Sequence, residues 1–130
     1  MVITLPDADP SRQRAIRALR CAPFCLPLFQ AMAVGGVPLL QIAGRAGLDQ
    51  GYTQKSLSAW GAEQDLIWLI QVGLLRREVD GQGITDSFRL TPLGRELLEW
   101  WQAAPGGRLP PPTWAERGLN FARRWGRWPV

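Results

Sequence analysis

This chain of 130 residues contains no histidine and only two cysteines. The absence of histidine removes the commonest general base and every catalytic triad that uses one. A structural zinc site needs about four ligands, which two cysteines without histidine do not supply. The sequence also offers no nucleophile beside a candidate base and no glycine-rich phosphate loop. We therefore expect a protein that is not an enzyme and that binds no metal or cofactor.

Long apolar runs are missing as well, since none approaches the ~20 residues that span a bilayer. The apolar segment 21–34 contains Pro23, Pro27 and Gln30, and it lies too far along the chain to look like a cleavable signal. Cys21 and Cys25 are interpreted as small buried side chains in a reducing compartment, with a reversible disulfide as the alternative. These features predict a cytoplasmic protein without a membrane span.

Positive charge is concentrated at the two ends of the sequence. The net charge is +4. Residues 1–29 hold four arginines against two aspartates, and residues 116–130 hold four arginines against one glutamate. Residues 30–115 hold seven basic side chains against eight acidic ones. Phosphate contacts depend on such cations. The candidate contacts are Arg12, Arg14, Arg17 and Arg20 near the first end and Arg123, Arg124 and Arg127 near the second.

Prolines, glycines and helical spacing divide the first part of the chain. Asp9-Pro10-Ser11 offers a helix start, and a helix over 11–22 is predicted to end near Pro23. The apolar stretch 26–33 should be buried. Gly35-Gly36 forms a turn, and a short helix over 38–46 is predicted to end at Gly47.

The middle of the chain is predicted to form the most deeply buried helix. Thr53 is expected to cap a helix that carries Leu57 and Trp60, with Gly61 as a candidate break. Its second part, 62–72, is apolar on nearly every side, which predicts burial on most sides. Gly73 is its expected end.

A β-hairpin and a final helix are predicted next. Strands over 74–79 and 87–90 flank the turn Asp80-Gly81-Gln82-Gly83. Thr91-Pro92 starts a helix that runs to about Gln102. Of Trp100 and Trp101, one is expected to face the core. The predicted core comprises Ile42, Leu66, Leu69, Ile70, Leu74, Leu90, Leu93 and Leu97.

Three segments, 40–48, 73–77 and 88–98, carry a resemblance to the winged helix-turn-helix family. The likeness covers about residues 38–101. It implies a mainly α fold with a small β-hairpin wing, here with N- and C-terminal helical extensions. The whole chain is also similar to small cyanobacterial proteins that share its Ala-Leu-Arg-Cys and Phe-Arg-Leu-Thr-Pro-Leu-Gly segments. We predict a flexible arm at 1–9, the winged-helix domain with its N-terminal extension at 10–103, a Pro/Gly linker at 104–112 and an amphipathic helix at 113–130.

The sequence departs from the family pattern in the region that would contact DNA. Gly47 and Gly73 lie further apart than the family pattern has them, and residues 49–58 are additional. The third helix of the family lies in the major groove. Its exposed positions here hold one base, Lys55, against the acids Glu63 and Asp65. The predicted wing tip, 80–86, has two acids and no base.

Two functions from different classes remain open. The first is a nucleic-acid-binding, transcription-regulator-like protein that uses the arginines at its ends and Lys55. The second is a winged-helix protein–protein interaction module without DNA binding, suggested by the acidic groove-facing surface and the seven tryptophans. Trp125 and Trp128 are candidate contacts in either case. The alternative is that the C-terminal helix docks on the body of the same chain through side chains at helical spacing: Trp114, Phe121 and Trp125. The partner and the oligomeric state are left open.

Overall fold

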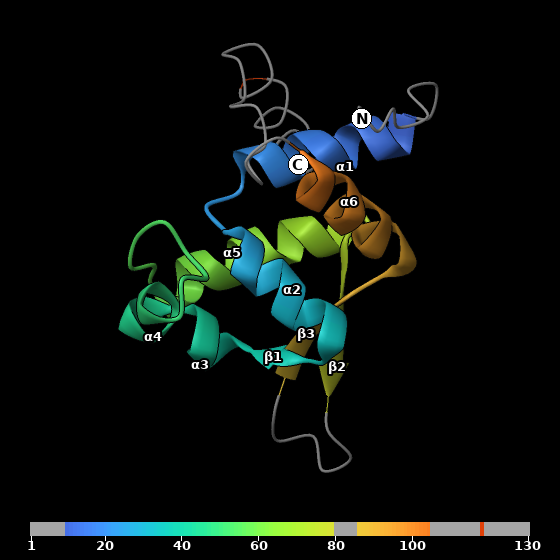
Figure 1. The fold of residues 1–130 in the computed structure, drawn as a ribbon. Coiled ribbons are helices and arrows are strands. Elements are labelled where there is room, and N and C mark those ends of the chain that lie inside the picture. The colour runs from blue at the N-terminus through green and yellow to red at the C-terminus, as the bar shows by residue number, and fades with distance from the viewer. Residues whose placement is uncertain (1–9, 80–85, 105–117, 119–130) are drawn as a thin grey trace.

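The computed structural model describes residues 10–79, 86–104 and 118 (Figure 1). This part of the chain is mainly helical with a small three-stranded antiparallel sheet, as the sequence predicted for the fold class. The predicted arm and, apart from Ala104 and Gly118, the predicted linker and C-terminal helix lie outside the described residues. The elements in chain order are α1 (Pro10–Cys21), α2 (Leu26–Val34), β1 (Val37–Pro38), α3 (Leu39–Ile42), α4 (Gly44–Asp49), α5 (Ala59–Gln71), β2 (Leu75–Val79), β3 (Asp86–Leu90) and α6 (Pro92–Ala103).

The sheet has the order β1-β3-β2. Its hairpin agrees with the prediction: β2 pairs with β3 in a register that sets Leu75 opposite Leu90. The third strand, β1, was not predicted. It is two residues long and pairs Val37 with Phe88, which is too short for any periodic signal to appear. Figure 1 shows the sheet at one end of the molecule and α1 at the other.

The helix predicted over 38–46 is wrong. In its place, α3 and α4 are separated at Ala43, whose backbone is extended, and Gly44 follows with a φ of +65°. Gly47 does not end a helix but lies buried inside α4. A Cβ at this position would collide with the carbonyl oxygen of Ile42. The glycine is therefore needed for a close backbone approach rather than for a helix end.

The start of α5 also differs from the prediction. Thr53 caps no helix; it is buried and forms an isolated β-bridge with Phe24. The cap is Ser58, whose Oγ accepts a hydrogen bond from the N–H of Gly61 at 3.0 Å. Gly61 therefore lies in the first turn and does not divide the helix, and the buried Leu57 precedes it. The predicted end is confirmed, since Gly73 has a φ of +89°.

Thr91 joins the hairpin to α6 as the Thr-Pro signal predicted. Its Oγ1 accepts from the N–H of Gly94 at 3.1 Å, and it donates to the carbonyl oxygens of Gly73 and Leu74. The hydroxyl thus caps α6 and also holds the residues between α5 and β2. Helix α1 is confirmed within one residue of its predicted ends, and the apolar stretch predicted to be buried over 26–33 forms α2, which buries Leu28, Phe29 and Met32.

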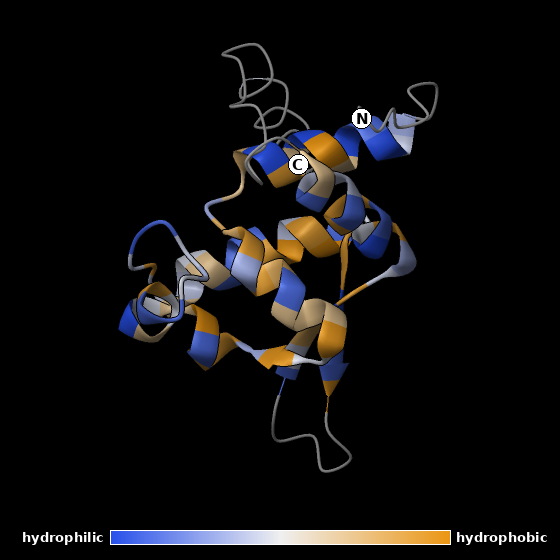
Figure 2. Ribbon diagram, viewed as in Figure 1, coloured by the Kyte–Doolittle hydropathy of each residue, from blue (hydrophilic) through white to orange (hydrophobic). Residues whose placement is uncertain are grey.

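The core lies between the helices and one face of the sheet, where the apolar residues gather (Figure 2). Six of the eight predicted core residues are buried, whereas Ile70 and Leu93 are partly buried and pack against them. Helices α1 and α2 add side chains that the predicted list lacked. Trp101 is buried and lies against Phe29 with ring centroids 5.3 Å apart, while Trp100 stays half-buried. Among the described helices, none is long and apolar enough to span a membrane.

Candidate interaction surfaces

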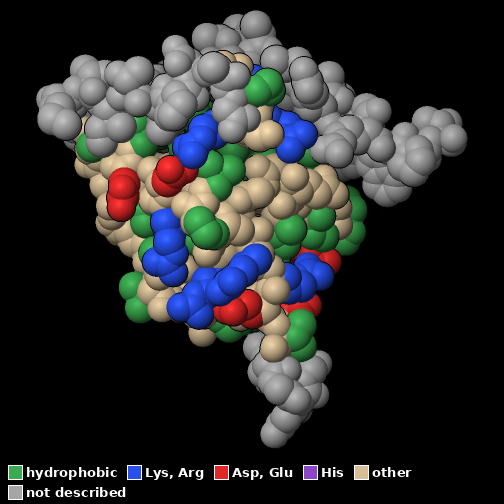
Figure 3. All heavy atoms as spheres, turned by 90° about the vertical axis from the view of Figure 1, so that its right-hand side faces the viewer, with side chains coloured by type: hydrophobic (Ala, Val, Ile, Leu, Met, Phe, Trp, Pro, Cys, Tyr) green, Lys and Arg blue, Asp and Glu red, His purple; other side chains and the backbone are tan. Residues whose placement is uncertain are grey.

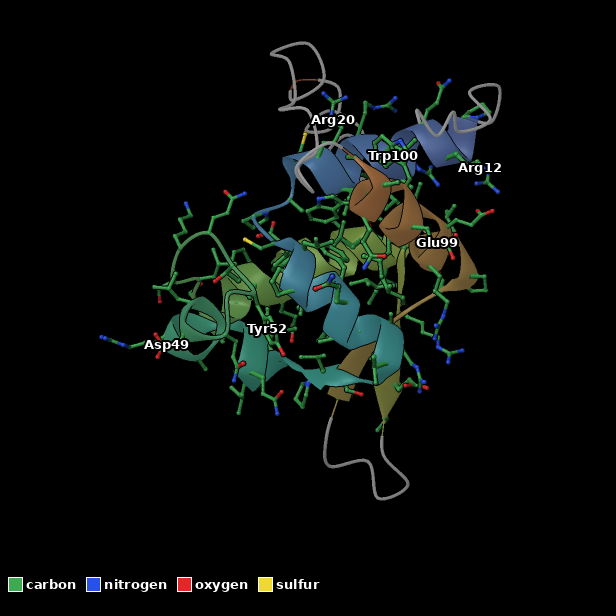
Figure 4. The ribbon with its side chains drawn as sticks, in the orientation of Figure 1. Arg12, Arg20, Asp49, Tyr52, Glu99 and Trp100 are labelled. Carbon is green, nitrogen blue, oxygen red and sulfur yellow. The ribbon has the colours of Figure 1, made fainter. Side chains whose placement is uncertain are left out.

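The four arginines of α1 do not form a freely exposed row. Arg12, Arg14, Arg17 and Arg20 are all half-buried. Arg12 Nη1 lies 2.6 Å from Glu96 Oε2, so its charge is already matched by α6. The Nε atoms of Arg14 and Arg17 are buried. Figure 4 shows Arg12 and Arg20 at opposite ends of the helix.

The Arg12–Glu96 ion pair lines an open groove between the start of α1 and the start of α6. The groove has a volume of about 500 Å³ and is also lined by Ser11, Pro92 and Leu93. Its two charges neutralise each other. The groove therefore offers no net charge to attract an ionic ligand.

The outer face of α5 carries no basic residue. Trp60, Gln64, Ile67 and Gln71 are three or four positions apart and therefore share this face. Trp60 is 70% exposed, and Gln64 and Ile67 are half-buried. The helix has two acids, Glu63 and Asp65, and no lysine or arginine. We call these four residues the α5 strip.

Lys55 and Tyr52 lie in the segment between α4 and α5. Lys55 is exposed and Tyr52 is half-buried. On the other side of this segment, Arg45 lies 3.9 Å from Asp49 across one turn of α4. Within the described residues, Lys55 is the base closest in sequence to the start of α5. It precedes the first residue of that helix, Ala59.

The outer face of the sheet holds a second group of arginines, which the sequence reasoning missed. Arg76 and Arg89 are opposite each other in the register, and Glu78 lies 3.5 Å from each of them. Arg89 also donates to the carbonyl oxygen of Val34 at 3.4 Å. Figure 3 shows Lys and Arg side chains gathered at the sheet end of this side of the molecule, with Asp and Glu among them. The strand alternation could have predicted the Arg76–Glu78 neighbourhood, because residues two apart share a face.

Arg77 lies on the opposite face of β2. Its guanidinium carbon is 5.3 Å from the ring centroid of Phe88, and its Nε is 3.7 Å from Asp86 Oδ2. This arginine covers the edge of the core and is paired with an acid. It contributes to packing as well as to surface charge.

Comparison with known proteins gives one result. A family model matches residues 6–124. The chain belongs to the Npun_F0494-like family. No curated protein and no solved structure matches the chain. This match, over nearly the whole chain, is consistent with the predicted similarity to small cyanobacterial proteins. It gives no support to the resemblance to winged helices.

In this Npun_F0494-like chain, Cys21 and Cys25 are half-buried and form no disulfide. Burial raises the pKa of the Cys25 thiol. Within the described ranges, no three side chains of Cys, Asp or Glu are grouped as a metal site requires. Five predicted contact residues lie outside the described residues: Arg123, Arg124, Trp125, Arg127 and Trp128.

Proposed function

We propose that this chain is a winged-helix protein–protein interaction module that contacts its partner through the α5 strip. The winged-helix assignment is supported by the order of elements, in which helices precede the β2–β3 hairpin and α6 follows it. The observation that carries the function is Trp60, a tryptophan 70% exposed on a helix face without any basic residue.

The charge of α5 argues against duplex DNA as the ligand of this helix. Binding to DNA depends largely on cations that neutralise phosphates. A recognition helix in the major groove would bring Glu63 and Asp65 close to phosphates with no base on the same helix to offset them. The exposed Lys55 could supply one phosphate contact at most.

The chemistry of the strip fits a protein segment. Tryptophan is enriched among the residues that dominate binding energy at protein interfaces. Ile67 extends the apolar surface along the helix, and Gln64 and Gln71 can exchange hydrogen bonds with a partner. Glu63 is at the margin of the strip. The fitting partner is therefore a segment with an apolar side chain flanked by lysine or arginine.

A photo-crosslinking amino acid at position 60 tests this proposal directly. In an extract of the cells that make the protein, we expect a discrete protein adduct from position 60. The matched control is the same crosslinker at position 45, also exposed but on α4, where no such adduct should form. Ile67→Lys should abolish the adduct while leaving the fold intact. An adduct of equal yield from positions 45 and 60 would contradict the proposal.

Nucleic-acid binding is the second candidate, because Arg76, Arg77 and Arg89 of the sheet add to the arginines of α1. The discriminating assay measures duplex DNA binding at two salt concentrations. If DNA binds, replacing Arg12, Arg14, Arg17 and Arg20 with alanine should weaken binding and flatten its salt dependence by ~0.9 per lost phosphate contact. Lys55→Ala should change the slope by about one contact or less. Tight, salt-dependent binding of this kind would replace the interaction-module proposal.

A further inference from the structure

The outward face of helix α1 is covered, although the described elements pack on other sides of this helix (Figure 1). Ala15, Ala18 and Leu19 are buried in the core, where α1 packs on α5. Arg17 is two positions from both Ala15 and Leu19, so it lies about 160° around the helix from each of them. The ion pair of Arg12 places α6 on the side of Leu19, again away from Arg17. Arg17 is nevertheless half-buried, and the described elements do not account for this burial.

The arginines on this face indicate what kind of side chain covers them. The Nε atoms of Arg14 and Arg17 are buried and have no hydrogen-bond partner among the described residues. A carboxylate packed here would accept a hydrogen bond from Nε. An aromatic ring that lies over a guanidinium covers it without accepting such a bond, and the ring is attracted to its charge. The face around Arg14 and Arg17 therefore fits aromatic side chains.

We propose that the last segment of the chain, residues 119–130, packs on the outward face of α1 over Arg14 and Arg17. Three aromatic residues of this segment are spaced at i, i+4 and i+7, the spacing of one helix face: Phe121, Trp125 and Trp128. At the same spacing, Arg123 and Arg127 lie away from the aromatic face and so away from the arginines of α1. This contact is separate from the α5 strip and does not rest on the function proposed for it.

The end of α6 brings the chain close to this face. Trp101 packs against Phe29 of α2 with ring centroids 5.3 Å apart, and α2 begins shortly after α1 ends. The stretch 105–118 can span ~45 Å at ~3.3 Å per residue, which exceeds the ~18 Å length of α1. Gly118 is exposed with open space around it, so the contact is assigned to the residues that follow it.

The arm at residues 1–9 is the alternative cover, because it leads directly into α1 at Pro10. It contains no aromatic residue, and its acids Asp7 and Asp9 would offer acceptors to the arginine Nε atoms. The C-terminal segment supplies the aromatic rings that the arm lacks. Once docked, this segment withholds Arg14 and Arg17 from anionic ligands.

Arginine modification by phenylglyoxal, located by mass spectrometry, tests the cover in the full chain. Replacing the three aromatic residues of the segment with serine should raise the modification rate of Arg17 severalfold, because its guanidinium becomes accessible. The matched control replaces three apolar residues of the arm and should leave that rate unchanged: Val2→Ser, Ile3→Ser and Leu5→Ser. Arg45, whose side chain is 89% exposed, should react equally in every variant. An unchanged rate at Arg17 in the C-terminal variant, or a rise in the arm variant instead, overturns the proposal.

Limited proteolysis by trypsin measures the same contact from its other side. Arg14→Ser with Arg17→Ser should speed cleavage after Arg123 and Arg124 severalfold, because cleavage follows the population in which the segment has left α1. The control, Arg45→Ser with Lys55→Ser, removes the same charge from two exposed positions and should not change this cleavage. Circular dichroism verifies that each variant keeps the helix content of the wild type. Equal cleavage in the wild type and in the α1 variant also overturns the proposal.

Discussion

Helices α5 and α6 have similar inner faces and very different outer faces. Each buries leucines completely: Leu66 and Leu69 from α5, and Leu97 from α6. The outer face of α6 is charged, with Arg95, Glu96 and Glu99 exposed. The outer face of α5 presents the α5 strip, which is uncharged and includes the exposed Trp60. Since both helices meet the same core, the core does not explain the difference. The face of α6 suits water, whereas that of α5 is the one through which we propose that a partner binds.

The largest expected effect is a difference in stability between variants on the inner face of α5 and a variant on its outer face. Leu69→Ala should lower the free energy of unfolding by ~2–5 kcal/mol, because it removes a fully buried side chain and leaves a cavity. Leu97→Ala on α6 should cost a similar amount. Trp60→Ala should change stability by about 0.5 kcal/mol or less, as expected for an exposed position. Urea denaturation measures all three variants.

If Trp60→Ala lowered the free energy of unfolding as much as Leu69→Ala does, the contrast between the inner and outer faces of α5 would be wrong. It would mean that Trp60 stabilises this chain rather than serving a contact with another molecule. The interaction proposal for the α5 strip would then lose the observation that carries it.

The inner faces could be predicted from the sequence, while much of the surface could not. A continuous apolar run identified Leu66 and Leu69, and helical spacing identified Leu97, because burial on most sides or on one side leaves these patterns in the chain. Thr91-Pro92 identified the start of α6 because capping is a local interaction. The interpretation of Gly47 failed because its role depends on a backbone approach that no local pattern encodes. Strand β1 exists through its pairing with β3 alone.

The candidate surfaces were predicted less well, for a related physical reason. The charge arithmetic identified the arginines of α1, but the pairing of Arg12 with Glu96 joins residues far apart in the sequence. The sequence placed one base, Lys55, on this helix; the structure begins α5 at Ala59, which leaves the helix without a base, and shows that Trp60 is exposed. Arg76 and Arg89 were missed because their proximity follows from the register of the hairpin.

The second expected effect compares the caps of the two helices. Thr91→Ala should cost ~1–2 kcal/mol, since the half-buried hydroxyl both caps α6 and donates to carbonyl oxygens before β2. Ser58→Ala should cost less, ~0.5–1 kcal/mol, because the exposed Ser58 makes one capping bond. Thermal unfolding of both variants gives the ranking. The reverse order would show that α5, rather than α6, depends more on its first turn.

The smallest expected effect concerns the charged outer face of α6. Arg12 and Glu96 form a partly exposed ion pair, with side chains 24% and 50% exposed. Such pairs contribute ~0–1 kcal/mol, and salt screens them. A double-mutant cycle with Arg12→Gln and Glu96→Gln should therefore give a small coupling energy that shrinks as salt concentration rises. Arg95→Gln, on the same helix, serves as the matched control because it should show no coupling to Arg12. A large coupling that high salt leaves unchanged would mean that this pair is shielded from solvent and holds α1 against α6. The outer face of α6 would then be a structural contact with α1. It would not be an ordinary solvent-facing surface, and the comparison with the α5 strip would fail.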